Sequence, residues 1–296
     1  MSTLSMSSAT PPAAAARGVT RFSMVRIVLG TLAVALPVAL TLILVQQLVD
    51  KPMRAYWPQA LAAVLCVLGY WLYVRKVERA AMDAFAGGAE GAMRGLGAGL
   101  LLGGALFVTV IGILAASGAY HVTGYNAWTV LLKPVTELVL VALIEEILFR
   151  AVLQRNLERS LGSWAAIAIS SLVFGLAHLP NANVTFAAIG VTVVAGVLFA
   201  AAYLVTRRLW LPLGMHFAWN YLSDAVFSIP TSGHPAKGIL QGQTSGAQWL
   251  SGGAYGVEAS LVTLVVLSIA SVVLLAAARR RGQLLGRAGA RALARA

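Results

Sequence analysis

Three apolar segments of the chain each carry polar side chains, mostly spaced by one helical turn. In chain order these residues are Glu145, Glu146, Arg150, His178, His216 and Asn220. An ionisable group inside a membrane segment is costly and by default marks a functional site. Carboxylate, imidazole and amide groups are the types that acid–base catalysis and oxyanion stabilisation require. The combination predicts an active site within a bilayer.

The first polar group follows from helix geometry. Residues four apart lie about 40° apart around a helix and face each other, whereas adjacent residues diverge by about 100°. Glu146 and Arg150 are therefore predicted to pair, and Glu145 to point away from that pair. A carboxylate without a cationic partner in a low-dielectric cavity is a candidate general base. We predict that Glu145 is the base, with Glu146 and Arg150 in support.

The other two segments supply the partners that such a base needs. His178 can hold or polarise a water beside Glu145, and His216 with Asn220, four apart on one face, can donate hydrogen bonds to an oxyanion. At 1.5 Å per residue, Glu145 and His178 lie about 21 and 24 Å from the cytoplasmic ends of their segments, and His216 and Asn220 about 13 to 19 Å. All four can share one layer. A lone His is usually a packing residue, so the conjunction carries this prediction.

Other polar residues are weaker candidates. Glu137 lies about two turns before Glu145, and Asp224 follows Asn220 by four residues; either could support the site or lie near an interface. His121 and His234 fall in predicted outer loops.

The composition identifies the class of protein. Hydrophobic residues make up 59% of the 296 positions and charged residues 11%, with a mean hydropathy of +0.82. These values indicate an all-α, polytopic membrane protein. About eight apolar segments are long enough to cross a hydrocarbon core: 25–48, 55–74, 96–118, 127–152, 163–180, 183–206, 210–230 and 257–278.

The placement of the basic residues predicts the orientation. A net charge of +12 could suggest nucleic-acid binding, but most Lys and Arg residues fall on alternate loops, which is the positive-inside pattern. Both termini are predicted to be cytoplasmic, with no nucleic acid as partner. The cytoplasmic basic residues are Arg17, Arg21, Arg26, Arg75, Lys76, Arg79, Arg94, Arg155, Arg159, Arg207, Arg208, Arg279, Arg280, Arg281, Arg287, Arg291 and Arg295.

Three regions are expected along the chain. Residues 1–24 are rich in Ser, Ala and Pro and are predicted to be a disordered cytoplasmic segment; 25–278 form one membrane domain; and 279–296 form a basic cytoplasmic tail close to anionic lipid.

The single Cys66 excludes an internal disulfide. Residues 230–255 read as a polar outer loop. The glycines of segment 95–104 permit close helix packing, although such spacings arise readily by chance in a chain with 29 Gly.

The polar residues form three ordered motifs: Glu145-Glu146 with Arg150, Phe174 with His178, and His216 with Asn220. In these motifs residues 127–225 resemble the CPBP or Abi family of intramembrane proteases, which includes CAAX prenyl proteases and bacteriocin-processing enzymes. The resemblance implies an intramembrane endopeptidase in which Glu145 and His178 activate water. It also implies that His216 and Asn220 form the oxyanion site, and that Glu146 with Arg150 orients the first motif.

The resemblance leaves the role of a metal open. Relatives have been read as zinc enzymes, which here would use Glu145, His178 and His216, or as metal-free glutamate proteases. The His-Glu-x-x-His signature is absent, so no metal or other cofactor is expected. The expected partners are membrane lipid and a membrane-tethered or hydrophobic peptide substrate. The Arg- and Ala-rich composition favours the inner (cell) membrane of a bacterium.

Two alternatives use the same polar residues. A non-catalytic protein could bind a peptide in this cavity, as in bacteriocin self-immunity. A transporter could relay protons through intramembrane carboxylates and histidines, although no inverted repeat is apparent.

Overall fold

The computed structural model describes residues 22–287 and 289. The predicted disorder of residues 1–24 therefore lies almost entirely outside the described residues, as does part of the predicted tail 279–296.

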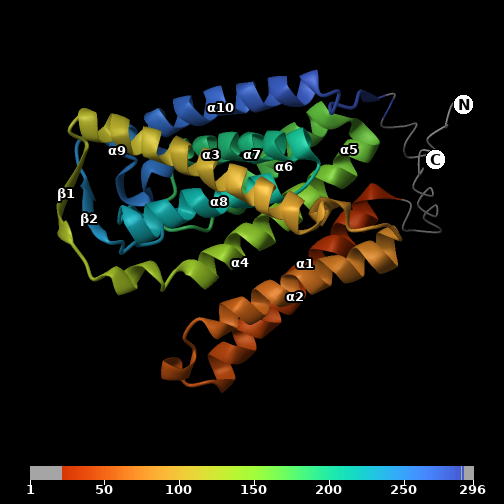
Figure 1. Ribbon diagram of the computed structural model, residues 1–296, viewed down its shortest axis with the longest axis horizontal. Helices are drawn as coiled ribbons and strands as arrows, with labels where there is room; N and C mark the ends of the chain where they lie inside the picture. The colour runs from red at the N-terminus through yellow and green to blue at the C-terminus, as the bar shows by residue number, and fades with distance from the viewer. Residues whose placement is uncertain (1–21, 288, 290–296) are drawn as a thin grey trace, which may run out of the picture.

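The described chain is a bundle of helices with one small sheet at one end (Figure 1). The α-helices are α1 Ser23–Leu48, α2 Trp57–Tyr73, α3 Gly88–Ala116, α4 Val135–Glu146, α5 Arg155–Leu161, α6 Ser163–Ala177, α7 Phe186–Thr206, α8 Trp210–Tyr221, α9 Gln248–Ser251 and α10 Leu261–Arg280. Three π-helical segments, Val74–Glu78, Ile147–Gln154 and Leu222–Val226, extend α2, α4 and α8. The strands are β1 Tyr120–Tyr125 and β2 Leu240–Thr244.

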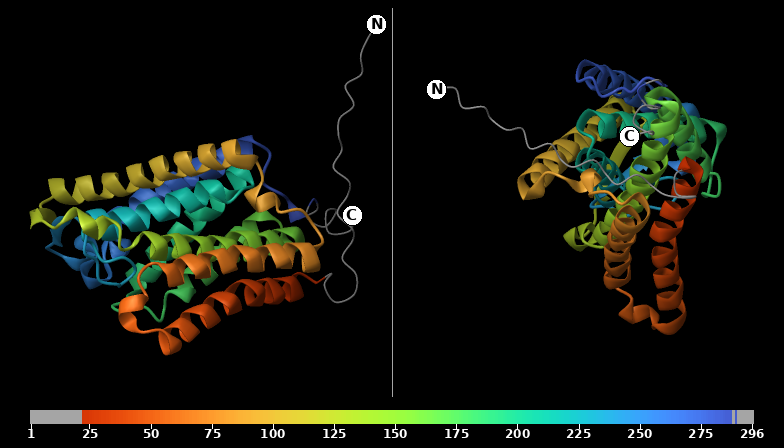
Figure 2. Two further views of the ribbon diagram at one scale, coloured as in Figure 1. Left: turned by 60° about the horizontal axis from the view of Figure 1, so that its bottom comes forward. Right: turned by 90° about the vertical axis from the view of Figure 1, so that its right-hand side faces the viewer.

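Five helices of the described chain are long and apolar enough to cross a membrane: α1, α2 with its π-helical end, α3, α7 and α10. The protein is a polytopic, mainly α-helical integral membrane protein, as predicted. The other three of the eight predicted segments are those that carry the polar motifs. There α4 runs through a π-helical segment into α5, α6 is only 15 residues long, and α8 ends in another π-helical segment. Two views show α1 and α2 as a hairpin on one side of the remaining helices (Figure 2).

The two-stranded sheet was not predicted. β1 and β2 pair antiparallel, with Tyr120 opposite Thr244 and Val122 opposite Gly242, and the register shifts between Val122 and Tyr125. β2 lies within the segment read as a polar loop. Its sequence, Leu-Gln-Gly-Gln-Thr, lacks the alternation of apolar and polar residues that signals a strand. Pairing satisfies backbone groups at the end of the bundle, which explains why this polar segment is ordered.

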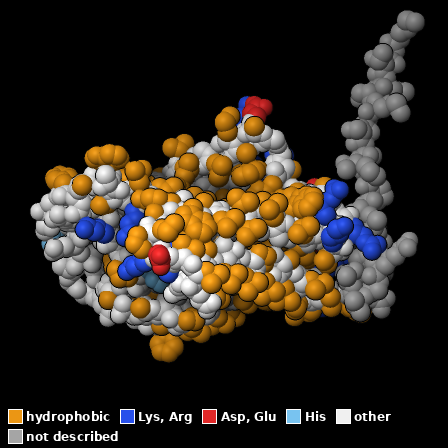
Figure 3. Space-filling view, turned by 90° about the horizontal axis from the view of Figure 1, so that it is seen from below, with side chains coloured by type: hydrophobic (Ala, Val, Ile, Leu, Met, Phe, Trp, Pro, Cys, Tyr) orange, Lys and Arg blue, Asp and Glu red, His pale blue; other side chains and the backbone are white. Residues whose placement is uncertain are grey.

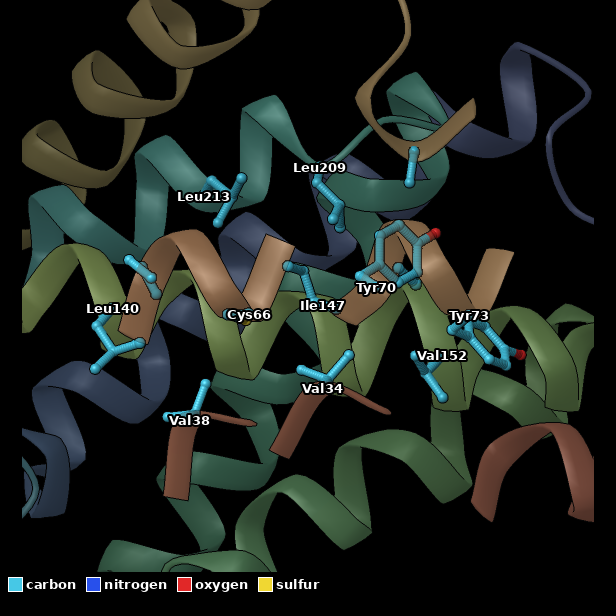
Figure 4. Close-up of a cluster of buried hydrophobic side chains, with 14 of the residues drawn as sticks. Val34, Val38, Cys66, Tyr70, Tyr73, Leu140, Ile147, Val152, Leu209 and Leu213 are labelled. Carbon is cyan, nitrogen blue, oxygen red and sulfur yellow. The ribbon is translucent and has the colours of Figure 1, made fainter. Parts of the chain in front are cut away.

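A hydrophobic cluster holds the α1–α2 hairpin against the motif-bearing helices. Figure 4 shows side chains of α1 and α2, including Val34, Cys66 and Tyr70, in one cluster with Ile147 and Leu213. Ile147 directly follows Glu146 in the chain. Cys66 is fully buried in this cluster.

Helices α3 and α8 approach so closely that only glycine fits between them. A Cβ atom on Gly99 would lie 2.8 Å from the Cα of Gly214 and closer still to the carbonyl oxygen of Leu211. A Cβ on Gly103 would lie 2.7 Å from the Cα of Met215. Such distances are too short for any side chain, so these glycines set the position of α8. They thereby position His216, the next residue after Met215.

Gly99→Ala is expected to destabilise the fold by about 1 to 3 kcal/mol because the added methyl group must push α8 away from α3. The matched control is Gly97→Ala, two residues earlier in the same helix, where a Cβ would meet nothing within 4 Å. The thermal midpoints of both variants in detergent check this prediction. Equal midpoints would show that the α3–α8 contact is not tight.

One end of the bundle, here called the basic end, gathers residues predicted to be cytoplasmic. Ion pairs there link the segment after α2 to α5, and α5 to the α7–α8 connection. Glu78 lies 3.5 Å from Arg155 and 3.1 Å from Arg159, and Glu158 pairs with Arg207. Arg281, after α10, donates to the carbonyl of Val205 at 3.1 Å. Figure 3 shows a broad hydrophobic surface with Lys and Arg side chains at its two ends. This pattern fits a bundle that spans a membrane.

Candidate active site

The predicted pair of Glu146 and Arg150 is present. Glu146 is the last residue of α4, and Arg150 lies in the π-helical segment that follows; both side chains are fully buried. Arg150 Nε donates to Glu146 Oε2 at 3.2 Å. Short π-helical segments occur frequently at functional sites. The pair thus marks the point at which the first motif leaves regular α-helical geometry.

Three phenylalanine rings surround the Arg150 guanidinium. Its central carbon lies 4.9 Å from the ring centroid of Phe174, 5.7 Å from that of Phe199 and 6.0 Å from that of Phe149. A cation at this distance from aromatic rings is attracted by their electron-rich faces, most strongly where water is excluded. Phe174 of the second motif therefore touches Arg150 of the first. This contact gives the phenylalanine of the Phe174–His178 motif a physical role.

His216 connects the two glutamates. Its Nδ1 lies 3.0 Å from Glu146 Oε1, and because an ionised carboxylate can only accept, the proton is assigned to Nδ1. Its Nε2 faces Glu145 Oε2 at 3.7 Å. The ring stacks on Phe199 with centroids 4.8 Å apart and planes inclined by 13°. Each oxygen of Glu146 thus receives one donor, and the His216 ring is fixed on both sides.

The carboxylate of Glu145 is left without such donors. Its side chain is 24% exposed, and its buried Oε2 accepts no hydrogen bond from the described residues. This agrees with the predicted divergence of the two neighbouring glutamates. Glu146 is occupied by Arg150 and His216, and Glu145 is free to interact with a water or a substrate.

His178 lies at the C-terminal end of α6. Its Nδ1 is 2.8 Å from the carbonyl oxygen of Phe174, so the proton is again assigned to Nδ1 and Nε2 is left as an acceptor. His178 makes no ion pair with Glu145, whereas His216 approaches that carboxylate. The sequence predicted that His178 holds a water beside Glu145 and that His216 donates to an oxyanion. In the structure, His216 is the histidine that lies closer to the Glu145 carboxylate.

All four residues predicted to be catalytic line one cavity of about 630 Å³: Glu145, His178, His216 and Asn220. Asn220 lies one turn after His216 on α8 and is 6% exposed. The weaker candidates Glu137 and Asp224 line the same cavity. His234, expected in a solvated loop, is exposed at its rim, whereas His121 lies on β1 and does not line it.

Glu258 and Phe199 also line this cavity, and neither was predicted. Glu258 Oε1 accepts from the indole N–H of Trp219 at 3.0 Å, and its Oε2 accepts from the backbone N–H and hydroxyl of Ser232, both at 2.6 Å. It therefore ties α8 to segment 231–237. The sequence could have pointed to Glu258, because it lies at the start of an apolar segment, where burying a charge is costly. Phe199 has no such signal among the many apolar residues of α7.

The side chains fit a zinc ion poorly. Within the part of the chain that the structure describes, no three His, Cys, Asp or Glu side chains are grouped as metal ligands. Glu145 and His216 approach each other, but His178 is not grouped with them. A structural or catalytic zinc site needs at least three protein ligands in close tetrahedral geometry.

Comparison with known proteins extends this description. Residues 126–222 match the family model described as type II CAAX prenyl endopeptidase Rce1-like. This region, about a third of the chain, is similar to the Rce1-like family. The match includes all three motifs. The chain is also 28% identical over 114 residues to the "Putative membrane peptidase YdiL" of Bacillus subtilis (strain 168). That alignment covers 38% of this chain and 42% of the relative, so it spans less than half of either protein. No solved structure matches the chain significantly.

Proposed function

We propose that this protein is an intramembrane endopeptidase that hydrolyses membrane-tethered or hydrophobic peptides with water as the nucleophile. The observation that carries the proposal is the free Glu145 carboxylate, which faces the same cavity as His178, His216 and Asn220. The Rce1-like match of this region supports a protease. The binding-protein alternative does not require an unoccupied carboxylate next to a fixed imidazole.

The proposed reaction begins with proton transfer. Glu145 takes a proton from a water that also donates to Nε2 of His178, and the oxygen of that water attacks the peptide carbonyl. The carbonyl oxygen becomes an oxyanion. Glu145 then gives the proton to the departing amine nitrogen as the C–N bond breaks. One water is consumed, and a carboxylic acid and an amine are released.

The oxyanion is stabilised from α8. Asn220 supplies an amide N–H, and His216 donates from Nε2 in its protonated form, since its Nδ1 proton is already donated to Glu146. The carboxylate of Glu146 stabilises that imidazolium, as a carboxylate behind a histidine does in hydrolases with a catalytic triad. Arg150 and its three phenylalanines hold Glu146 in place. Glu146 and Arg150 are thus positioning residues.

We further propose that no metal takes part and that the chain resides in the cell membrane of a bacterium with both termini cytoplasmic. The arrangement of donors supports the first proposal, and the basic end supports the orientation. Membrane lipid and a tethered peptide are the partners proposed.

The test is cleavage of a library of membrane-tethered peptides by the purified full chain in detergent, with and without a chelator. We expect specific cleavage that the chelator leaves unchanged. Loss of cleavage with the chelator, restored by added zinc, would replace the metal-free mechanism with a metal mechanism. No cleavage of a broad library would favour a peptide-binding protein.

A further inference from the structure

The cavity is lined by residues at the end of the bundle opposite the basic end. Its lining includes Lys133 and Pro134 just before α4, Asp224 after α8 and Glu258 just before α10. The opposite termini of the same helices lie at the basic end, near Arg159, Arg208 and Arg281. The β1–β2 sheet lies at that same end of the bundle (Figure 1). The lining therefore runs from the catalytic layer toward the sheet end.

The mouth of this cavity is polar and exposed to solvent. Lys133, His234 and Lys237 are exposed residues of its lining. Segment 231–237 forms one side of the mouth and is held in place by Glu258 and by Asp224, whose Oδ1 accepts from the backbone N–H of Lys237 at 3.2 Å. A polar rim held by hydrogen bonds can admit an extended peptide from water.

The route toward the basic end is blocked. Between Glu145 and the basic end, α4 and the π-helical segment after it carry Glu146, Arg150 and Gln154. These three side chains are completely buried, and Arg150 is enclosed by phenylalanines. Asn156 is fully buried, and Glu158 is 3% exposed and paired with Arg207. A peptide coming from the basic end would have to displace these paired charges.

The geometry points to substrate entry from the membrane face opposite the basic end. The positive-inside pattern makes that the non-cytoplasmic face. This inference rests on the proposed endopeptidase function and adds the substrate class: a peptide tethered to the outer leaflet, or exposed on the outer side, that reaches inward as an extended chain. Helix α4 begins at Val135, two residues after Lys133, and rises about 15 Å from there to Glu145. At about 3.3 Å per extended residue, at least four or five substrate residues must lie between the mouth and the cleaved bond.

The first test uses sealed membrane vesicles in two orientations. An acylated peptide that carries at least six residues beyond its cleavage site is added to the outer leaflet. We expect right-side-out vesicles to cleave it, and inverted vesicles to cleave it only after detergent opens them. Cleavage by intact inverted vesicles, with none by right-side-out vesicles, would overturn the inference. Absence of cleavage even in detergent would instead count against the proposed function.

A second test does not depend on cleavage. In a Cys66→Ala background, His234→Cys at the mouth is compared with Arg79→Cys at the basic end; both residues are exposed. A membrane-impermeant maleimide applied to intact cells is expected to label the first variant and to label the second only after permeabilisation. The reverse pattern would place the mouth on the cytoplasmic side and overturn the inference.

Discussion

Glu145→Gln abolishes peptide cleavage, with an expected fall in rate of about 10²- to 10⁴-fold, the usual contribution of a positioned general base. The amide has nearly the shape of the carboxylate but cannot take a proton from water. Because Glu145 accepts no hydrogen bond through its Oε2 within the described structure, its replacement leaves no buried donor unpaired. The fold should therefore survive. Initial rates on a peptide cleaved by the wild type, together with thermal midpoints in detergent, check both parts of this expectation.

Glu137→Gln is the matched control. Glu137 is on the same helix, two turns earlier, and lines the same cavity, but it is exposed near the mouth. We expect it to retain cleavage within a few-fold of wild type. If Glu145→Gln retained full activity, or if both variants lost it equally, Glu145 would not be the base, and the peptide-binding and transport alternatives would have to be tested next.

Arg150→Met lowers the free energy of unfolding by about 3 to 5 kcal/mol, the range expected when one partner of a buried ion pair is removed. Methionine fills part of the space between the three phenylalanines, so the dominant loss is electrostatic. Glu146 is left buried with His216 as its remaining donor. The shift of the thermal midpoint in detergent measures this effect.

The Glu90–Arg94 pair provides the control because it has the same spacing of four residues on a helix. Its Arg and Glu side chains are 80% and 74% exposed, and an exposed pair of this kind contributes about 1 kcal/mol or less. Arg94→Met should therefore hardly change the midpoint. Adding Glu146→Gln to Arg150→Met should recover part of the lost stability, since the unpaired charge is gone. Equal shifts for Arg94→Met and Arg150→Met would show that burial does not matter to this pair.

The two experiments separate two roles of neighbouring residues. Glu145 is expected to affect the rate without affecting stability, because it is held by few contacts. Arg150 is expected to affect stability first and activity through it, because it fixes Glu146, which in turn fixes His216. Activity that fell in Arg150→Met while stability was unchanged would contradict this order.

Much of this protein could be predicted because the relevant forces are local. The composition alone determined an integral membrane protein, since so many apolar residues require an apolar solvent. The pairing of Glu146 with Arg150 and the divergence of Glu145 followed from the turn of a single helix. The shared depth of the motif residues followed from the rise per residue, and the structure brings all four into one cavity.

What only the tertiary structure decided depends on how helices are rotated against one another. Whether His178 or His216 approaches Glu145 is set by the packing of α8 on α3 through Gly99 and Gly103, which the sequence shows only as a common glycine spacing. The contacts of Phe199 with Arg150 and His216 arise in the same way. The pairing of β1 with β2 joins segments more than 100 residues apart. The direction in which the cavity opens is set by several helix ends at once, and no local pattern of residues encodes such an arrangement.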